Sequence, residues 1–208
     1  MGEVVALVDY GAGNLHSVHN ALKAVGARVV VTADANTVRA ADRIVLPGVG
    51  SFKACADGLR ALSGMVEALG ERVHVGGAPF LGICVGMQLL ADRGLEFGTH
   101  KGLGWIPGEV RLIEPTDPAI KIPHMGWNDV ALLPHARGSH MIEEGEAYFL
   151  HSYHFAAENP SDIAAMTDHG EGLVAAVACD NVLGVQFHPE KSQRFGLELL
   201  ERFLTWEP

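Results

Sequence analysis

The first half of the chain alternates short apolar runs with segments whose apolar residues recur at helical spacing. Strands are predicted at residues 4–8, 28–32, 42–46 and 79–83. Helices are predicted from the turn at residues 9–14 to about Val25, and at residues 52–62, 65–72 and 85–93. Short apolar strands that alternate with amphipathic helices are typical of a parallel sheet covered on both faces. We therefore expect an α/β fold.

From about residue 104 the pattern changes to short runs in which apolar and polar positions alternate. These runs, at residues 109–113, 147–151, 163–166 and 173–178, precede an apolar run at 182–187. They predict antiparallel strands and hairpins attached to the same sheet. A final helix is predicted at roughly residues 194–204. Because there is no repeat or linker, residues 1–208 are expected to form one α/β domain with a β-rich antiparallel elaboration.

Composition narrows the possible partners and the compartment. The 208 residues are 48% hydrophobic and carry a formal net charge of −10 without a Lys/Arg cluster. Such a balance argues against nucleic acid and anionic membranes as partners. The N-terminal apolar run at residues 4–8 is too short for a membrane span or a secretory segment. Three cysteines, an odd number, fit reduced thiols. We therefore expect a cytoplasmic protein.

A cysteine between two glycines is the first candidate for chemistry. Cys84 follows the apolar run at residues 79–83 and is flanked by Gly82 and Gly86. This pattern between a strand and a helix is typical of a nucleophile elbow, where the strained backbone needs glycine on either side. The elbow places the sulfur at a helix N-terminus, where thiolate is favoured.

Two further side chains complete a candidate triad. His188 and Glu190 follow the strand predicted at residues 182–187. Extended geometry would direct residues two apart to one face, so the carboxylate could orient the imidazole. Together with Cys84, they predict an activated nucleophile in the chain order of an α/β enzyme.

Two glycine-containing turns allow other interpretations. The turn at residues 46–50 could direct backbone N–H groups at a developing oxyanion, or it could be an ordinary tight turn between strand and helix. The turn at residues 11–14 resembles the start of a dinucleotide fingerprint. However, His16 stands where the third glycine is required, and no acidic residue ends the next strand. A dinucleotide site is therefore not expected.

The histidines do not predict a metal centre. No Cys/His pair has a zinc spacing, and His151 and His154, three apart on an extended segment, would face opposite ways. Surface or structural roles are the simplest interpretation of His16, His19, His74, His100, His135, His140 and His169. Cys55 and Cys179 fall in a helical and a strand pattern, which favours buried small hydrophobic residues.

Residues 81–88 together with residues 186–190 resemble the class I (triad) glutamine amidotransferases. Further segments are similar to one family within that class, the glutaminase subunits of imidazole glycerol phosphate synthase: residues 8–15, 46–52, 102–108, 123–128, 148–153 and 187–192. The resemblance covers essentially the whole chain, although residues 133–146 look like a variable loop. It implies a flavodoxin-like open, mainly parallel sheet, glutamine as substrate and no cofactor.

The resemblance also implies a role for each matched residue. Cys84 would attack the side-chain amide of glutamine to form a γ-glutamyl thioester, with His188 as the acid and base and Glu190 as its orienting partner. The backbone N–H groups of Val85, Val49 and Gly50 would hold the oxyanion. The matched substrate-binding positions are Gly48, Gln88, Glu96, Ser152 and Tyr153.

The family's partner is a (β/α)8-barrel cyclase subunit, which receives the ammonia in a heterodimer. The resemblance places five positions at the docking face: Asn14, Met125, Trp127, Asn128 and Lys191. From the residues alone, Trp127 could equally pack in the protein's own core. The flexible backbone at residues 48–50 suggests that the isolated subunit is nearly inactive until the loaded cyclase binds.

Three alternatives stay open. A triad glutaminase that serves another synthase is disfavoured by the segments at residues 47–50 and 123–128. A non-catalytic module on the same fold is disfavoured by the intact set of Cys84, His188 and Glu190. A cysteine peptidase is disfavoured because Gln88 and Glu96 indicate a small amino-acid site beside the nucleophile.

Overall fold

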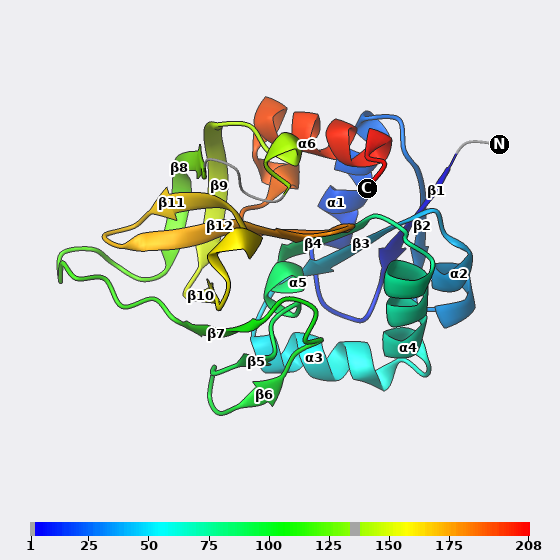
Figure 1. The fold of residues 1–208 in the computed structure, drawn as a ribbon, viewed down its shortest axis with the longest axis horizontal. Helices are drawn as coiled ribbons and strands as arrows, with labels where there is room; N and C mark the ends of the chain where they lie inside the picture. Colours follow the sequence, from blue (N-terminus) through cyan, green and yellow to red (C-terminus); the bar gives the residue numbers. More distant parts are fainter. Residues whose placement is uncertain (1–2, 134–137) are drawn as a thin grey trace.

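The computed structural model describes residues 3–133 and 138–208, and nine strands within these ranges form one mixed sheet (Figure 1). Its strand order is β2-β1-β3-β4-β13-β12-β11-β8-β9. In chain order the strands are β1 (Val4–Val8), β2 (Arg28–Thr32), β3 (Arg43–Gly48), β4 (Phe80–Cys84), β8 (His124–Leu132), β9 (Gly145–His151), β11 (Ile163–Asp168), β12 (Gly172–Cys179) and β13 (Val182–Val185).

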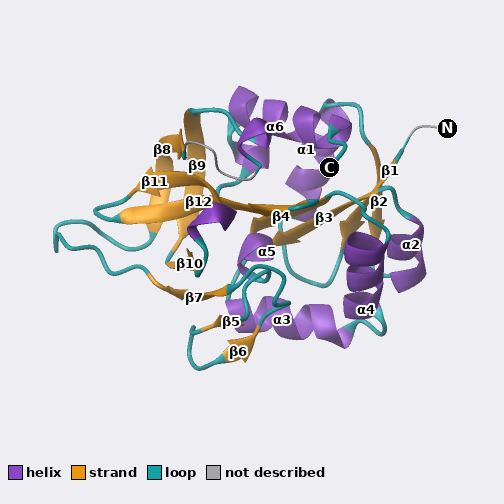
Figure 2. Cartoon of the chain, in the orientation of Figure 1, coloured by secondary structure: helices purple, strands orange, loops and turns teal. Residues whose placement is uncertain are grey.

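The strands from β2 to β13 pair in parallel, in the order of a flavodoxin-like sheet. The helices are α1 (Leu15–Ala24), α2 (Ala35–Ala40), α3 (Phe52–Ala61), α4 (Met65–Gly70), α5 (Val85–Gln88) and α6 (Gln193–Thr205). Figure 2 shows α1 and α6 on one face of this sheet and α3, α4 and α5 on the other. The predicted open α/β sheet with helices on both faces is therefore confirmed. Within the described ranges, no helix is long and apolar enough to span a lipid bilayer.

Burial explains why these segments form strands and helices. Every residue of β3, β4 and β13 is buried, as expected for strands covered on both faces. Helix α3 begins at Phe52 because the side chain of Ser51 accepts a hydrogen bond from the backbone N–H of Ala54 at 3.2 Å. It buries one face at helical spacing through Phe52, Cys55, Ala56 and Leu59.

A second sheet, of four strands in the described part of the chain, lies beside the first. Its strands are β5 (Arg93–Gly94), β6 (His100–Lys101), β7 (Gly108–Leu112) and β10 (Tyr153–Ala157). The prediction that residues 109–113 join the main sheet was wrong. The chain passes from β9 to β10 at Ser152, and β10 then pairs antiparallel with β7 instead.

Helix α2 and strands β5, β6, β8 and β10 were absent from the predicted set. Helix α2 is short, and its start is marked by the Asp34 side chain, which accepts from the backbone N–H of Thr37 at 2.8 Å. Strand β8 pairs antiparallel with β9 along its length. The remaining short elements are a π turn at Glu71–Val75 and 3-10 turns at Ser139–Met141, Pro160–Asp162 and Pro189–Lys191.

The helix predicted at residues 85–93 is shorter than expected. Helix α5 ends at Gln88, and the backbone carbonyl of Leu89 accepts from the N–H of Leu103 at 2.7 Å. Because this carbonyl is used by a distant loop, the helical hydrogen-bond ladder does not continue. The chain turns back toward β5 and places Glu96 near the ends of the central strands.

Candidate active site

Cys84 occupies a sharp elbow at the end of β4. Its backbone has φ +55° and ψ −113°, a conformation that side-chain-bearing residues rarely adopt. A Cβ atom on Gly82 would lie 2.6 Å from the carbonyl oxygen of Gly86. A Cβ atom on Gly86 would collide with the carbonyl oxygen of Leu46. Both glycines are thus required by close backbone packing, and the predicted elbow geometry is confirmed.

The imidazole of His188 contacts the carboxylate of Glu190. His188 Nδ1 lies 2.8 Å from Glu190 Oε1, and the two side chains are 2% and 1% exposed. The prediction that both lie on one face of a strand was wrong, because β13 ends at Val185 and Pro189–Lys191 forms a 3-10 turn. The fixed φ of Pro189 suits the first position of such a turn, which brings the carboxylate back to the imidazole.

His188 also connects Glu190 to the cysteine. Burial alone would lower the pKa of His188, but hydrogen bonds with Cys84 and Glu190 outweigh it and raise the pKa to about 10. Because Nδ1 faces the carboxylate, Nε2 is left for the sulfur. The imidazole is therefore protonated at neutral pH and places a positive charge beside Cys84. The structure thus brings together the three side chains predicted as a triad.

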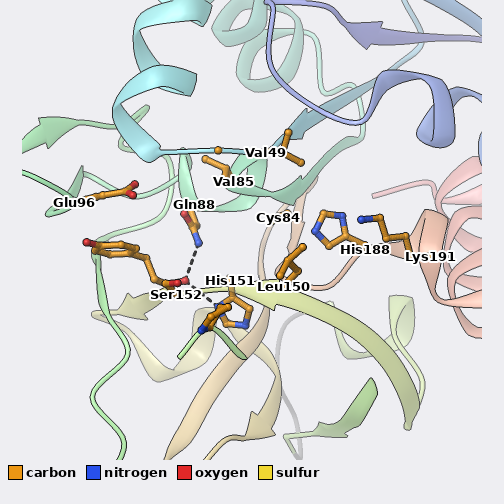
Figure 3. Close-up of a pocket in the computed structure, with 13 residues that line it drawn as sticks. Val49, Cys84, Val85, Gln88, Glu96, Leu150, His151, Ser152, His188 and Lys191 are labelled. Atoms are coloured by element: carbon orange, nitrogen blue, oxygen red, sulfur yellow. Dashed lines mark hydrogen bonds between the residues drawn. The ribbon is translucent and has the colours of Figure 1, made fainter. Parts of the chain in front are cut away.

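A chain of amides reaches the same sulfur from the other side. Gln88 is buried, and its Nε2 donates to the carbonyl of Tyr153 at 2.9 Å (Figure 3) and to Gln186 Oε1 at 3.0 Å. Gln186 Nε2 in turn donates to Cys84 Sγ at 3.7 Å. Gln186 belongs to a motif noted in the sequence but had no assigned role. Its signal was a polar residue at the end of a buried apolar run.

A cavity of about 300 Å³ opens in front of Cys84. The predicted site residues that line it are Val49, Gly50, Cys84, Val85, Gln88, Glu96, Ser152, Tyr153, His188 and Lys191. Figure 3 shows Glu96 at one end and His188 with Lys191 at the other. Gly48 is buried and pairs with Cys84 in the register of β3 and β4. The cavity has the size of a small-molecule site.

Two backbone segments can present N–H groups to this cavity. Val85 is the first residue of α5, so its N–H has no acceptor within the helix. The carbonyl of Val49 accepts from Cys55 Sγ at 3.4 Å. In a trans peptide the carbonyl and the following N–H point in opposite directions, so the N–H of Gly50 faces away from Cys55.

The other predicted substrate-binding groups are partly engaged within the chain. Glu96 Oε2 accepts from the backbone N–H of Phe52 at 2.7 Å, which fixes the carboxylate at one end of the cavity. The carbonyl of Ser152 accepts from the N–H of Ile113 at 2.9 Å, and that of Tyr153 accepts from Gln88. A ligand contact from this segment would therefore use N–H groups or side chains.

An exposed apolar surface on β8 and β9 adjoins the cavity. Met125 and Trp127 are 64% and 46% exposed and point to the same side of β8. Their partners in the strand register are Leu150, which lines the cavity, and Tyr148. Trp127 is therefore not packed in the protein's own core. Lys191 is exposed at the rim, with Nζ 5.7 Å from the centre of the Tyr148 ring.

Asn128 and Asn14, also predicted at the docking face, are both partly buried. Asn128 turns inward, because alternate residues of a strand face opposite sides. Its Nδ2 donates to the carbonyl of Asp168 at 2.7 Å and lies 3.0 Å from His124 Nε2. Asn14 is partly buried just before α1, and its carbonyl accepts from the N–H of Val18 at 3.0 Å.

A buried histidine pair adjoins the cavity, which His151 helps to line. His124 Nδ1 is 3.0 Å from His151 Nε2, in adjacent positions of β8 and β9. Burial lowers the pKa of His124 to about 4 and that of His151 to about 3. The pair could have been found only from the register of the β8–β9 hairpin. His135, read in the sequence as a surface or structural histidine, lies outside the described residues.

The sequence matches the family described as Glutamine amidotransferase class-I over residues 6–206. The imidazole glycerol phosphate synthase subunit HisH of Zymomonas mobilis is 57% identical over an alignment of 208 positions, which covers 98% of this chain and 96% of that protein. The subunit of the same name from Rhodospirillum rubrum is 52% identical over an alignment of 215 positions, which covers 98% of this chain and 99% of that protein.

The fold has counterparts among solved structures. A crystal structure described as a glutamine amidotransferase superposes with a TM-score of 0.75 at 19% identity and covers 98% of both chains. At that identity the likeness supports the fold alone. The family match and the two relatives extend over nearly the full length. The chain therefore belongs to the class I glutamine amidotransferases, within the HisH subunits of imidazole glycerol phosphate synthase.

Proposed function

We propose that this chain hydrolyses glutamine to glutamate and ammonia through Cys84, His188 and Glu190. The ammonia then passes to the cyclase subunit of imidazole glycerol phosphate synthase. The observation that carries the proposal is the buried contact of 2.8 Å between His188 and Glu190, beside a strained Cys84 elbow that opens into a cavity. The relatives' printed names support the choice of synthase.

In the first step the Cys84 sulfur attacks the side-chain amide carbon of glutamine. A C–S bond forms and the C–N bond breaks, while His188 transfers its proton to the departing ammonia. The oxyanion formed on the way accepts hydrogen bonds from the N–H of Val85 and from one N–H at Val49 or Gly50. Losing one such donor typically lowers the rate on the order of 100-fold.

In the second step water attacks the γ-glutamyl thioester. His188 takes one proton from the water and keeps it, while the sulfur leaves as thiolate when glutamate is released, which regenerates the starting pair of thiolate and imidazolium. Glu190 holds the Nδ1 proton and stabilises the imidazolium in both steps. One water and one glutamine thus give one glutamate and one ammonia.

The cavity selects a small amino acid. The Glu96 carboxylate suits the ammonium group of glutamine. The Nε2 of Gln88 donates to the carbonyl of Tyr153, which leaves Oε1 of Gln88 to accept a hydrogen bond from the substrate. Gly48 does not line the cavity, but it lets β3 pack closely against the start of α5, because a Cβ atom there would lie 2.6 Å from the backbone nitrogen of Gly86. Ser152 and Tyr153 would supply the opposite wall.

The chemistry of ammonia in water supports a cyclase partner that receives it directly. Ammonia released into water at neutral pH is protonated and lost as a nucleophile, so direct transfer between subunits is favoured. The exposed Met125 and Trp127, next to the cavity rim, support docking there in a heterodimer. The complex would form imidazole glycerol phosphate and aminoimidazole carboxamide ribotide in histidine biosynthesis. We place it in the cytoplasm, free of nucleic acid and membrane.

The test supplies the cyclase subunit and its nucleotide substrate with either glutamine or an ammonium salt. Glutamine should support product formation only when this chain is present, whereas the ammonium salt should support the cyclase alone. Cys84→Ala in the complex should lose the first activity and keep the second. Brisk glutamate release that is unaffected by the cyclase would point to a different synthase. Absence of glutamate release from glutamine, both with and without the cyclase, would favour a non-catalytic module.

A further inference from the structure

Gln186 is a fully buried amide between two residues of the proposed site. Its exposed fraction is 0%. Strand β13 runs parallel to β4 with Val185 opposite Ile83, so the next residues, Gln186 and Cys84, lie level with each other. The side chain contacts Cys84 at one end and Gln88 at the other.

Neighbouring groups fix which end of this amide donates. The carbonyl of Tyr153 can only accept, so the Gln88 atom 2.9 Å from it is the NH2 group. The same NH2 lies 3.0 Å from Gln186, which must present its Oε1 there. The NH2 of Gln186 is therefore left to face Cys84 Sγ at 3.7 Å.

We infer that Gln186 is a positioning residue that favours the thiolate of Cys84 with its N–H and holds Gln88 in place with its oxygen. The inference rests on the proposed function, in which Cys84 is the nucleophile and Gln88 binds glutamine. A donor hydrogen bond is stronger to an anionic acceptor than to a neutral one, so this N–H favours thiolate over thiol. One side chain would thereby couple nucleophile activation to substrate binding.

The effect of Gln186 on Cys84 can be distinguished from the effects of the titratable and charged groups near the sulfur. The titratable and charged groups around it are His188 after β13, Tyr10 after β1, Cys55 on α3, and Glu96 and Lys191 along the cavity. Burial raises the pKa of Tyr10 well above its usual range and that of Cys55 to about 11, so both are neutral at pH 7. A substitution at Gln186 leaves all five in place.

The experiment compares wild type with Gln186→Met, Gln88→Met and the double variant, each in the complex with the cyclase. It measures the pH profile of iodoacetamide alkylation at Cys84 and the KM for glutamine. Gln186→Met should move the alkylation midpoint to higher pH and raise KM on the order of tenfold. Gln88→Met should raise KM and leave the midpoint unchanged.

The double variant tests whether Gln186 acts through Gln88. Its KM should be close to that of Gln88→Met alone, because the two substitutions remove one shared interaction. A KM effect equal to the product of the single effects would overturn this part. The matched control is Asn181→Leu, which loses amide bonds to Val73 and Ala78 of 2.8 and 2.7 Å at the far end of β13. It should change stability and leave both readouts unchanged.

A wild-type measurement covers the case in which Gln186→Met does not fold. The side-chain amide resonance of Gln186 should follow the titration of Cys84, and a resonance that ignores it would overturn the inference. A failure of the proposed function can be distinguished from a failure of the inference about Gln186. Wild type that releases no glutamate would refute the function and leave the Gln186–Cys84 coupling standing. Active wild type with an unchanged alkylation midpoint in folded Gln186→Met would refute the inference alone.

Discussion

His188 Nδ1 lies 2.8 Å from Glu190 Oε1 across a single 3-10 turn, with both side chains almost fully buried. The carboxylate accepts from Nδ1, so the imidazole presents Nε2 to Cys84. In this arrangement Glu190 sets both the tautomer and the charge of the imidazole. Its removal should therefore affect catalysis more than substrate binding.

Glu190→Gln should lower kcat for glutamine hydrolysis by about 100-fold to 10,000-fold, because an amide no longer fixes the tautomer or stabilises the imidazolium. KM should change little. The pKa of His188, followed by NMR, should fall from its raised position in the same variant. Glu158→Gln, at an exposed glutamate, is the matched control. An unchanged kcat in Glu190→Gln would remove the residue from the proposed mechanism.

The buried pair of His124 and His151 should make the protein acid-sensitive. Burial lowers their pKa values to about 4 and about 3 from an ordinary value of 6.5, so both are neutral when folded at pH 5. The unfolded chain binds the extra protons below pH 6.5, so the free energy of unfolding falls as pH drops from about 6.5 toward 4. Urea unfolding at several pH values measures this slope.

Replacing both His124 and His151 by Phe should flatten the acid-side slope. His16→Gln, at an exposed histidine, serves as the control and should keep the wild-type slope. If wild-type stability is constant between pH 6.5 and 4, the two imidazoles are not held neutral by burial.

Gly86→Ala should prevent the elbow from forming. The added Cβ would collide with the carbonyl oxygen of Leu46, and neither backbone segment can move without shifting β3 or α5. We expect a loss of several kcal/mol of stability, comparable to overpacking of a tight core, together with loss of glutaminase activity. Gly70→Ala is the matched control, since a Cβ there meets no atom within 4 Å. It should be neutral or slightly stabilising.

Trp127→Ala should weaken binding of the cyclase subunit. A half-exposed tryptophan beside the cavity rim is typical of an interface hot spot, whose loss costs about 2 kcal/mol or roughly 30-fold in Kd. Titration calorimetry with the cyclase measures this change. Val75→Ala removes a side chain that is 87% exposed elsewhere on the surface and should not alter Kd. Equal affinity of both variants and wild type would move the docking face away from β8.

The sequence was sufficient for the elements that obey one simple pattern. The apolar runs that became β1, β2 and β4 and the amphipathic α3 and α6 were predicted within one or two residues. The Cys84 elbow could also be predicted, because a cysteine flanked by glycines directly after a buried strand is typical of a strained turn into a helix. These features depend on local spacing and on burial.

Features that depend on contacts between distant segments could not be predicted. The division into two sheets depends on the chain crossing between them at Ser152, and the inward face of Asn128 depends on β8 being a strand. The pairing of His188 with Glu190 was expected, but through a strand rather than a 3-10 turn. Gln186 acquires its partners from α5 and β4, which its local sequence does not specify.

The most direct measurement is glutamate release from glutamine by the complex with the cyclase, compared for wild type, Cys84→Ala and Cys179→Ala. Both substitutions remove one thiol, and Cys179 lies at the end of β12 in the sheet. The proposed mechanism predicts that Cys84→Ala abolishes release while Cys179→Ala keeps it near the wild-type rate. Undiminished release by Cys84→Ala would contradict the assignment of Cys84 as the nucleophile.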